Sequence, residues 1–450
     1  MSLAYRTVPD DDHRTAYRRL LQYAFAPERG PDPDDESRER PAAFEPRGLY
    51  DVSDAGAEPR GAAGPDSEPG GTTESDATPG RPPAADVDPS SLVVCGALVD
   101  FRMRVRGEGR RVGGVSAVAS PPEHRRRGYV ATLLDGMHAE LRDRDVAIAA
   151  LWPFSHPFYA RFGYGRANDY AVHELPPAAL DAPAATPTDE GTLRRLTPGD
   201  VDALSAVHEA SAVEPLAVQR SPDWWRLRIF QSWSDDRYVY GWADDAGELR
   251  SYLAYRVEEG EGADGGRRLV VDYWGAADEE AYRGLLAFLH NHDSQVSTVR
   301  FVAPDASLLD RLSDPAEAET TVKPGPMVRV VDVTAALAGL STPADSGEVA
   351  LRVRDERHAW NDGTFVVGVE DGHTTCRRVD AGADTAAGGD SPAGEVVSVD
   401  VGALSRLVVG ARSATDLAGL GVVEGSDDAV ARLDALLPRE TPGPYLREFF

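Results

Sequence analysis

Residues 115–165 constrain the fold of this chain more than any other stretch. They read as an apolar strand at 115–120, an arginine-rich turn, an amphipathic helix, and a second apolar strand at 146–152. The apolar residues of the helix recur on one face, which indicates that this face packs on a sheet. A strand–helix–strand order of this kind predicts an α/β fold with room for a ligand between the two strands.

The turn between the first strand and the helix predicts a phosphate-binding site. A helix N-terminus presents free N–H groups and a partial positive charge, and arginine forks add charge and further donors. A glycine in the turn lets the backbone approach a ligand closely. We therefore expect a pyrophosphate to bind here, whereas the alternative is a solvated basic turn. The residues concerned are Arg125, Arg126, Arg127, Gly128, Tyr129 and Val130.

The strand before this turn consists mostly of small residues, so a ligand could lie close to its backbone. A pantetheine arm carries amide groups, which can pair with an exposed strand edge as an added strand does. Val118 and Ser120 would line such a slot. The alternative is an ordinary core strand that contacts no ligand.

Tyr159 stands out in the Tyr-Ala-Arg-Phe-Gly-Tyr segment that follows the second strand. Acylation of an amine needs a base for the ammonium proton and an acid for the departing thiolate. A tyrosine hydroxyl, with a reference pKa of about 10, can supply the proton for the thiolate. The alternative is a core aromatic residue. His156 is a weaker candidate for the base, and His124 and His138 are weaker still.

The charge composition of the chain limits which kinds of partner the protein can bind. The formal net charge is −28, and Lys323 is the only lysine among the 47 Lys and Arg residues. An acidic chain with arginine in place of lysine fits a salt-adapted, haloarchaeal-type proteome, in which excess acid keeps the surface hydrated. At molar salt the Debye length falls to about 3 Å, which screens the self-repulsion. The alternative role for the excess of acidic residues is the recruitment of a cationic substrate. The sequence shows no basic face of the kind that binds nucleic acid, which disfavours a nucleic-acid partner.

The sequence carries no signal for a disulfide, a metal site or a membrane span. Cys95 and Cys376 lie far apart, with no metal-ligand spacing around them. No apolar run reaches the length of about 18 residues that a spanning helix needs. Polar residues follow Met1 directly, without the pattern of a signal peptide. We expect a cytoplasmic protein that uses no metal.

Changes in composition suggest about three domains. The first covers 1–185 and includes an acidic, Pro- and Gly-rich insertion at 28–91, which we expect to be disordered except for an apolar patch at 44–52. The second, at 190–325, repeats the strand–helix–strand order over 269–302. Its turn is acidic and has no arginine, so we expect this repeat to have lost its phosphate site.

The third predicted domain, at 326–450, has an α+β pattern. Strands at 350–354 and 365–369 are joined through an Asn-Asp-Gly turn signal, and helical stretches follow at 402–410 and 427–437. The chain ends on two phenylalanines. Because termini stay ordered only when something holds them, these aromatic residues predict a docked tail.

Two motifs together resemble the Eis (enhanced intracellular survival) family of the GNAT superfamily of N-acetyltransferases. They are Pro-Glu-His-Arg-Arg-Arg-Gly at 122–128 and Tyr-Ala-Arg-Phe-Gly-Tyr-Gly at 159–165. The resemblance covers most of the chain. It implies an N-terminal acetyltransferase domain, a degenerate second one and a sterol carrier protein-like C-terminal domain. It further implies acetyl-CoA as the acyl donor and a homo-oligomer, specifically a hexamer.

The resemblance also assigns catalytic roles. The tyrosine that opens the second motif, Tyr159, is the general acid, and the carboxylate of the C-terminal Phe450 is the base. An α-carboxylate has a reference pKa near roughly 3.5, so it is a weak base unless it is desolvated. Val130 departs from the small residue of the superfamily's turn. The insertion at 28–91 departs from the family's usual length, at a place where such enzymes shape the acceptor pocket.

These observations favour an acetyl-CoA-dependent enzyme that transfers an acetyl group directly to a primary amine on a small molecule. One alternative is a non-catalytic sensor of acyl-CoA or lipid, suggested by the third domain. Another is a protein or peptide N-acetyltransferase, which differs only in the size of its acceptor.

Overall fold

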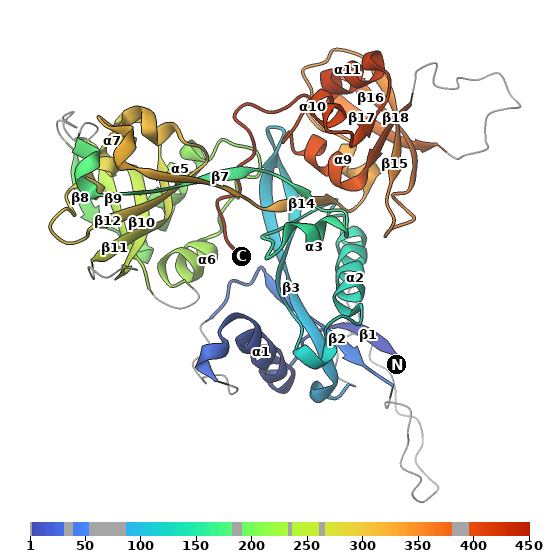
Figure 1. Ribbon diagram of the computed structural model, residues 1–450, viewed down its shortest axis with the longest axis horizontal. Coiled ribbons are helices and arrows are strands. Elements are labelled where there is room, and N and C mark those ends of the chain that lie inside the picture. The colour runs from blue at the N-terminus through green and yellow to red at the C-terminus, as the bar shows by residue number, and fades with distance from the viewer. Residues whose placement is uncertain are drawn as a thin grey trace, which may run out of the picture.

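Three sheets, each in its own lobe, make up the part of the chain that the computed structural model describes. That part comprises residues 2–30, 39–53, 87–181, 191–232, 236–260, 266–379 and 396–450. Two of the sheets have seven strands and the third has five. Figure 1 shows the lobes arranged around the C-terminus, which lies between the first and second lobes.

The first sheet carries the predicted strand–helix–strand unit. Helix α2 (Tyr129–Asp143) packs on one face through residues such as Leu133 and Met137, which are fully buried. Helix α1 (Asp11–Phe25) covers the opposite face through Leu21. In sheet order the strands are β1 (Leu3–Thr7), β2 (Phe44–Asp51), β3 (Leu92–Val105), β4 (Glu108–Ala119), β5 (Ile148–Leu151), β14 (Met327–Val330) and β6 (Gly165–Arg166).

Strand β2 corrects the expected extent of the acidic insertion. It pairs with β1 on one side and β3 on the other, and its Leu49 and Tyr50 are fully buried. Residues 44–51 are therefore an internal strand of the first sheet. The sequence predicted an ordered patch at 44–52 but not its place inside the sheet, because that place depends on pairing with the distant strands β1 and β3. Residues 31–38 and 54–86 lie outside the described part.

The second sheet repeats the architecture of the first, as the sequence predicted. Helix α7 (Glu279–His290) links two parallel strands, and helix α5 (Val201–Ser211) packs on the same sheet. In sheet order the strands are β13 (Glu319–Pro324), β7 (Asp169–Leu175), β12 (Thr298–Ala303), β11 (Arg267–Ala276), β10 (Leu249–Glu259), β9 (Tyr238–Ala243) and β8 (Thr192–Arg195).

Two strands lie in a different sheet from the one their sequence position indicates. Strand β7, within the expected first domain, belongs to the second sheet, where it pairs with β12 and β13. Strand β14, at the start of the expected third domain, lies in the first sheet between β5 and β6. The boundaries at 185 and 326 therefore do not separate the sheets. Local patterning could not show this, because distant residues decide where a strand pairs.

The third lobe is an α+β unit, and its predicted strand pair and helices are confirmed. Its sheet contains, in order, β17 (His373–Val379), β16 (Gly363–Glu370), β15 (Glu348–Arg354), β18 (Val396–Asp400) and β19 (Val423–Glu424). Its helices are α8 (Val333–Leu337), α9 (Val401–Val408), α10 (Ala414–Gly419) and α11 (Asp427–Leu436). Helix α9 also packs against β14, so this lobe touches the first sheet directly.

The end of the chain leaves the third lobe and runs back between the other two (Figure 1). Tyr445, Leu446 and Glu448 are buried, and the Tyr445 N–H donates to the carbonyl of Pro215, 2.9 Å away. The predicted docking of the tail is therefore confirmed.

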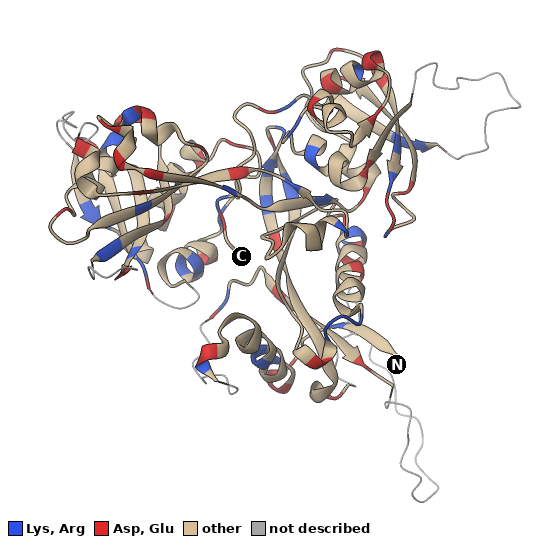
Figure 2. Cartoon of the chain, viewed as in Figure 1, with Lys and Arg blue, Asp and Glu red and all other residues tan. Residues whose placement is uncertain are grey.

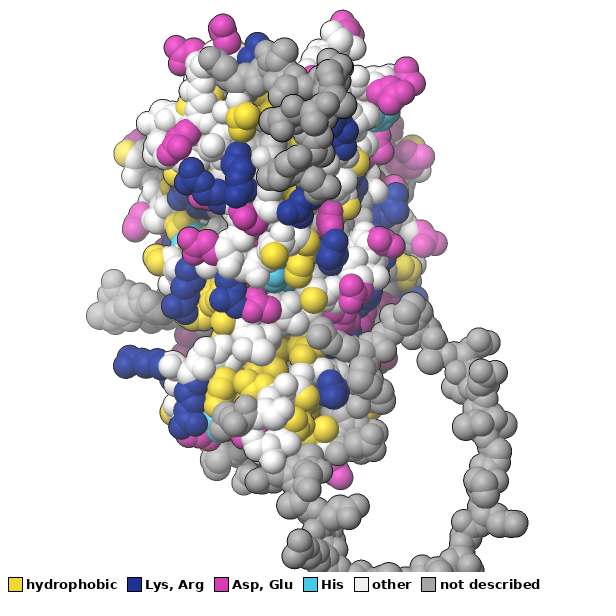
Figure 3. Space-filling view, turned by 90° about the vertical axis from the view of Figure 1, so that its right-hand side faces the viewer, with side chains coloured by type: hydrophobic (Ala, Val, Ile, Leu, Met, Phe, Trp, Pro, Cys, Tyr) yellow, Lys and Arg dark blue, Asp and Glu magenta, His cyan; other side chains and the backbone are white. Residues whose placement is uncertain are grey.

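The surface mixes charges of both signs. On the face turned to the viewer in Figure 3, basic and acidic side chains alternate and form no continuous basic area. Across the described ranges, no helix is long and apolar enough to cross a bilayer.

Candidate active site

A slot opens where β4 and β5 diverge. These parallel strands pair only at Gly113 with Ala149 and at Gly114 with Ala150. Beyond Gly114, the register between β3 and β4 shifts and Ala117 adopts a left-handed backbone (φ 54°). A bulge of this kind bends a strand and frees part of its edge. The end of β4 that contains the half-buried Val118, together with Ser120 just after it, therefore lies beside the opening.

The arginine turn places an uncapped helix N-terminus after this strand. Gly128 precedes α2 with φ 82°, and no side chain caps the helix. Arg125, Arg126 and Arg127 are exposed, and Figure 2 shows a basic, blue stretch in the loop at one end of α2. Arg125 Nε donates to the Ser120 carbonyl at 3.1 Å. Among the described residues, Arg126 and Arg127 have no acidic partner, so their charge is available to an anion.

Tyr129 and Val130, the first two residues of α2, anchor the turn to the core. The Tyr129 ring is buried in the core between α2 and the sheet, and Val130 packs at the edge of the same core. They fix the direction of the helix, so that its first N–H groups face the turn. The predicted residues at 125–130 thus form one turn with exposed arginines and an uncapped helix start.

Tyr159 lies on the short helix α3 (His156–Ala160), which follows β5. Its ring is only 4% exposed and contacts the rings of Phe154, Phe158 and Tyr164. Its hydroxyl has no hydrogen-bond partner within the part of the chain that the structure describes. Burial raises the pKa of Tyr159 to about 12. The hydroxyl therefore stays protonated near neutral pH and is free to donate.

The last residue of the chain reaches the fork between β4 and β5. The Phe450 ring packs on Phe101 of β3, with ring centroids 4.7 Å apart. A Cβ added to Gly114 would lie 2.8 Å from the Phe450 ring, so this glycine makes the close approach possible. Gly114 forms the last pair before the two strands diverge. The chain terminus and the slot therefore meet at the same point of the sheet.

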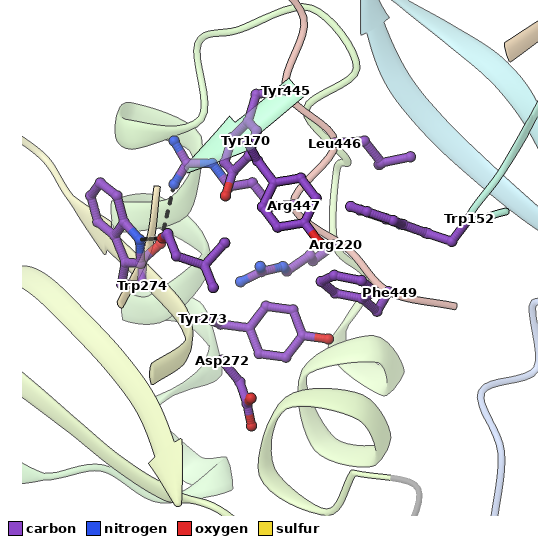
Figure 4. A pocket seen from close by; sticks show the side chains of 11 residues that line it. Trp152, Tyr170, Arg220, Asp272, Tyr273, Trp274, Tyr445, Leu446, Arg447 and Phe449 are labelled. Carbon is purple, nitrogen blue, oxygen red and sulfur yellow. Dashed lines mark hydrogen bonds between the residues drawn. The ribbon is translucent and has the colours of Figure 1, made fainter. Parts of the chain in front are cut away.

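The residues just before Phe450 are held by side chains from two lobes (Figure 4). From the first lobe, Trp152 stacks on Phe449 at 4.0 Å and donates through Nε1 to the Glu448 carbonyl at 2.6 Å. From the second lobe, Arg228 Nη2 donates to the Phe449 carbonyl at 2.7 Å. The sequence analysis missed these anchors. The isolated arginines in the apolar stretch 216–230 were the only local signal for them.

A buried ion pair fixes the same segment. Arg220 Nε lies 2.6 Å from Glu448 Oε1, and both side chains are at most 1% exposed. Arg220 also donates through Nη1 to the Tyr252 hydroxyl at 2.8 Å. Breaking a buried pair from one side leaves an uncompensated charge in the interior, which is strongly destabilising.

We therefore expect Arg220→Met to lower the free energy of unfolding by about 3–5 kcal/mol. The double variant Arg220→Met/Glu448→Met should recover most of this loss, because no charge then remains unpaired. Denaturant unfolding monitored by tryptophan fluorescence measures both. Arg432→Met, at an exposed position of α11, is the control and should stay within about 0.5 kcal/mol of wild type. A single and a double variant of equal stability would contradict the role of the pair.

The corresponding slot of the second lobe is closed. Its helix α7 is capped by Asp278, which accepts from the Ala281 N–H, so the helix start is already satisfied and acidic. Trp274 Nε1 donates to the Val302 carbonyl across the ends of β11 and β12, and Arg447 of the tail donates to the Trp274 carbonyl (Figure 4). The cavity left beside them measures about 20 Å³, enough for roughly one water molecule.

The three histidines of the sequence analysis lie in different places. His156 Nε2 is 2.9 Å from the Gly325 carbonyl, so this ring is engaged by the backbone. His124 contacts the Tyr129 ring in the arginine turn. His138 is buried at the seam between α2 and the third lobe, next to His358.

With Asp135, the pair His138 and His358 forms a group of three side chains that could in principle ligate a metal. Arg357 already engages the Asp135 carboxylate with two nitrogens. The charges of Arg329 and Arg357 also act on both imidazoles. The group therefore fits a cation poorly.

Comparisons with known protein families match each lobe. Residues 87–167 and, separately, residues 216–330 match acetyltransferase (GNAT) domains, and residues 333–445 match a sterol carrier protein domain. The predicted architecture of two GNAT folds followed by a sterol carrier protein-like domain is thereby confirmed. The GNAT matches imply the use of acetyl-CoA.

Curated relatives that match most of the chain are named as N-acetyltransferases. An uncharacterised N-acetyltransferase of Streptomyces coelicolor is 29% identical over 64% of this chain and 71% of its own length. The N-acetyltransferase Eis of Mycobacterium tuberculosis is 28% identical over 80% of this chain and 87% of its own length.

Solved structures share the whole fold. A probable N-acyltransferase from Enterococcus faecalis superposes with a TM-score of 0.76 at 18% identity, and Eis1 from Mycobacterium abscessus with a TM-score of 0.69 at 23% identity. Both matches cover the full length of both chains. The domain matches and the curated relatives support an N-acetyltransferase with GNAT folds that is similar to the Eis family along most of its length.

Proposed function

We propose that this N-acetyltransferase moves the acetyl group of acetyl-CoA directly to a primary amine, with Tyr159 as the general acid and the Phe450 carboxylate as the base. The observation that supports the proposal is that both groups lie beside β5. The unengaged Tyr159 hydroxyl follows β5, and the chain terminus packs at the last pair of β4 and β5.

The donor would lie along the freed edge of β4. Its pantetheine amides would pair with the backbone around Val118 and Ser120, and its pyrophosphate would bind the helix start and arginines at 125–130. This orientation points the thioester toward the fork, because the strand leads from the fork to the turn.

The chemistry needs three proton transfers and one exchange of bonds. The Phe450 carboxylate accepts a proton from the ammonium group, and the free amine attacks the thioester carbonyl. A C–N bond forms as the C–S bond breaks, and Tyr159 protonates the departing thiolate. The acylated nitrogen then gives up its extra proton, which restores the Tyr159 hydroxyl. The Phe450 ring packs on Phe101, which holds the end of the chain at the fork. The buried tyrosine keeps its proton until the thiolate forms.

Thiol release from acetyl-CoA in high salt tests the proposal, with a panel of polyamines, aminoglycosides and amino-terminal peptides. Amine-dependent release, with the acetylated amine identified by mass spectrometry, is the expected result. Release with peptides alone would favour a protein acceptor. Binding of acetyl-CoA in calorimetry without release for any amine would favour the sensor. We further propose that the protein is a homo-oligomer, which light scattering at the same salt concentration measures.

The arginine turn yields a prediction about the donor. Arg126→Ala/Arg127→Ala removes two exposed charges that have no acidic partner among the described residues. Each exposed charge is worth up to about 1 kcal/mol, so the KM for acetyl-CoA should rise by about tenfold with kcat almost unchanged. The effect should shrink as salt is added.

Arg432→Ala/Arg439→Ala removes two exposed arginines from the third lobe and is the matched control, with no expected change in KM. Equal KM values for the two double variants would contradict the assignment of the turn.

A further inference from the structure

A row of buried polar side chains connects the third lobe to the segment that carries Tyr159. His358 Nε2 lies 3.0 Å from His138 Nδ1, and His138 Nε2 lies 2.8 Å from the Tyr164 hydroxyl. All three side chains are at most 3% exposed. His358 belongs to the third lobe, His138 to α2, and Tyr164 to the same Tyr-Ala-Arg-Phe-Gly-Tyr segment as Tyr159.

The row is complete when both histidines are neutral. A neutral imidazole has one donor and one acceptor nitrogen. The His358–His138 contact and the His138–Tyr164 contact can therefore each be a hydrogen bond, and this is possible in two arrangements of the protons. If His358 donates to His138, then His138 donates to the Tyr164 oxygen. In the reverse arrangement the Tyr164 hydroxyl donates to His138, which donates to His358. If both imidazoles carried a second proton, His358 Nε2 and His138 Nδ1 would both be donors and their hydrogen bond would be lost.

A second contact, made by the first sheet and supported by the third lobe, holds the same segment. Arg329 of β14 donates to the Phe162 carbonyl and forms a buried ion pair with Asp355 at 2.6 Å. Asn361 Nδ2 supports that carboxylate at 3.1 Å. A Cβ on Gly163 would lie 1.7 Å from the Arg329 guanidinium, so only glycine permits this approach. The loop 355–361 thus holds the segment through a carbonyl as well as through Tyr164.

Tyr159 depends on Tyr164 and Phe162 for its own position. The Tyr159 ring meets the Tyr164 ring edge-on at 5.9 Å, and the Phe162 N–H donates to the Tyr159 carbonyl at 2.9 Å. Because the Tyr159 hydroxyl has no protein partner among the described residues, packing alone decides where it points. A shift of Tyr164 is therefore passed directly to the Tyr159 hydroxyl.

We propose that His358 of the sterol carrier protein-like domain is a positioning residue for acetyl transfer, which acts through His138 and Tyr164 to hold Tyr159 at the thiolate. This inference rests on the proposed role of Tyr159. It gives the third domain a part in the reaction without contact to either substrate.

The charges around the pair set the expected pH dependence. Arg329 of β14 and Arg357 of the third lobe face it with positive charge, whereas Asp135 of α2 and Asp355 supply negative charge. Burial and then Arg329 lower the pKa of His138 well below its ordinary value and that of His358 to about 4. A histidine with a lowered pKa binds its proton more tightly in the unfolded chain, so the row loses stability as the pH falls from about 6.5 toward 4.

His358→Leu and Tyr164→Phe test the proposal, since each removes one polar end of the row while keeping most of the volume. A misplacement of about 1 Å can cost a reaction up to 10²-fold, so we expect kcat to fall by about 10- to 100-fold in each. The KM for acetyl-CoA should stay within about twofold. His358→Gln, which keeps a donor and an acceptor, should restore most of kcat.

Two controls separate positioning from loss of structure. His173→Leu replaces another buried histidine with two polar contacts, on β7 of the second sheet, and should leave kcat unchanged. In a Tyr159→Phe background, His358→Leu should lower kcat no further. An equal fall in both backgrounds, or no fall at all in the wild-type background, would overturn the inference. If Tyr159→Phe by itself left kcat intact, the proposed function would fail instead.

Discussion

Replacing Tyr159 with Phe is expected to lower kcat by about 10²- to 10⁴-fold, which is the usual contribution of a general acid. The variant keeps the ring and therefore the contacts with Phe154, Phe158 and Tyr164. The lost hydroxyl bonds no described residue, so folding stability should not fall. Steady-state thiol release together with thermal unfolding measures the two quantities side by side.

The pH profile and a control sharpen this result. With the pKa of Tyr159 raised to about 12, ionisation of this group should cause no loss of wild-type activity below roughly pH 11. Tyr23→Phe, at an exposed tyrosine of α1, should behave as wild type. A Tyr159→Phe enzyme with full kcat would remove Tyr159 from the mechanism and leave it as a core residue.

One glycine added after Phe450 should lower kcat by a similar 10²- to 10⁴-fold if the terminal carboxylate is the base. The extension turns that carboxylate into an amide and moves the new one about 3.5 Å along the chain. The anchors on Glu448 and Phe449 are untouched, so the tail should stay docked. Thiol release and native mass determination of the same preparation give the comparison.

Phe450→Ala separates the charge from the ring. It keeps a terminal carboxylate and loses only the packing on Phe101 and Gly114. We expect it to retain far more activity than the glycine extension. The same glycine added at the N-terminus should have no effect. An extended enzyme as active as wild type would show that Phe450 serves packing alone.

The parts of the site that the sequence predicts are those set by neighbours in the chain. Gly128 and the arginines before it stand next to an apolar helix, so a pyrophosphate turn follows from their order. The Tyr-Ala-Arg-Phe-Gly-Tyr segment was likewise visible beside the strand that delivers it. Each of these structures is fixed within about ten residues, where turn and helix preferences act.

The remainder depends on pairs that no local pattern reveals. Arg220 and Glu448 are 228 positions apart, and His138 and His358 are 220 apart. A lone arginine in an apolar stretch indicates that a partner exists, but not which residue it is. The four residues of β14 would suit any of the three sheets, and only the gap between β5 and β6 decides their place.

The position of β14 also sets an order of events for the growing chain. The first sheet lacks a strand between β5 and β6 until residues 327–330 have been made, about 160 residues after β6. At a synthesis rate of about 5–20 residues per second, this interval lasts roughly 10–30 s. Throughout it, β5 and β6 present unpaired edges to other chains, a state prone to aggregation. A chain cut at residue 185 would lack β14 and would keep those edges unpaired.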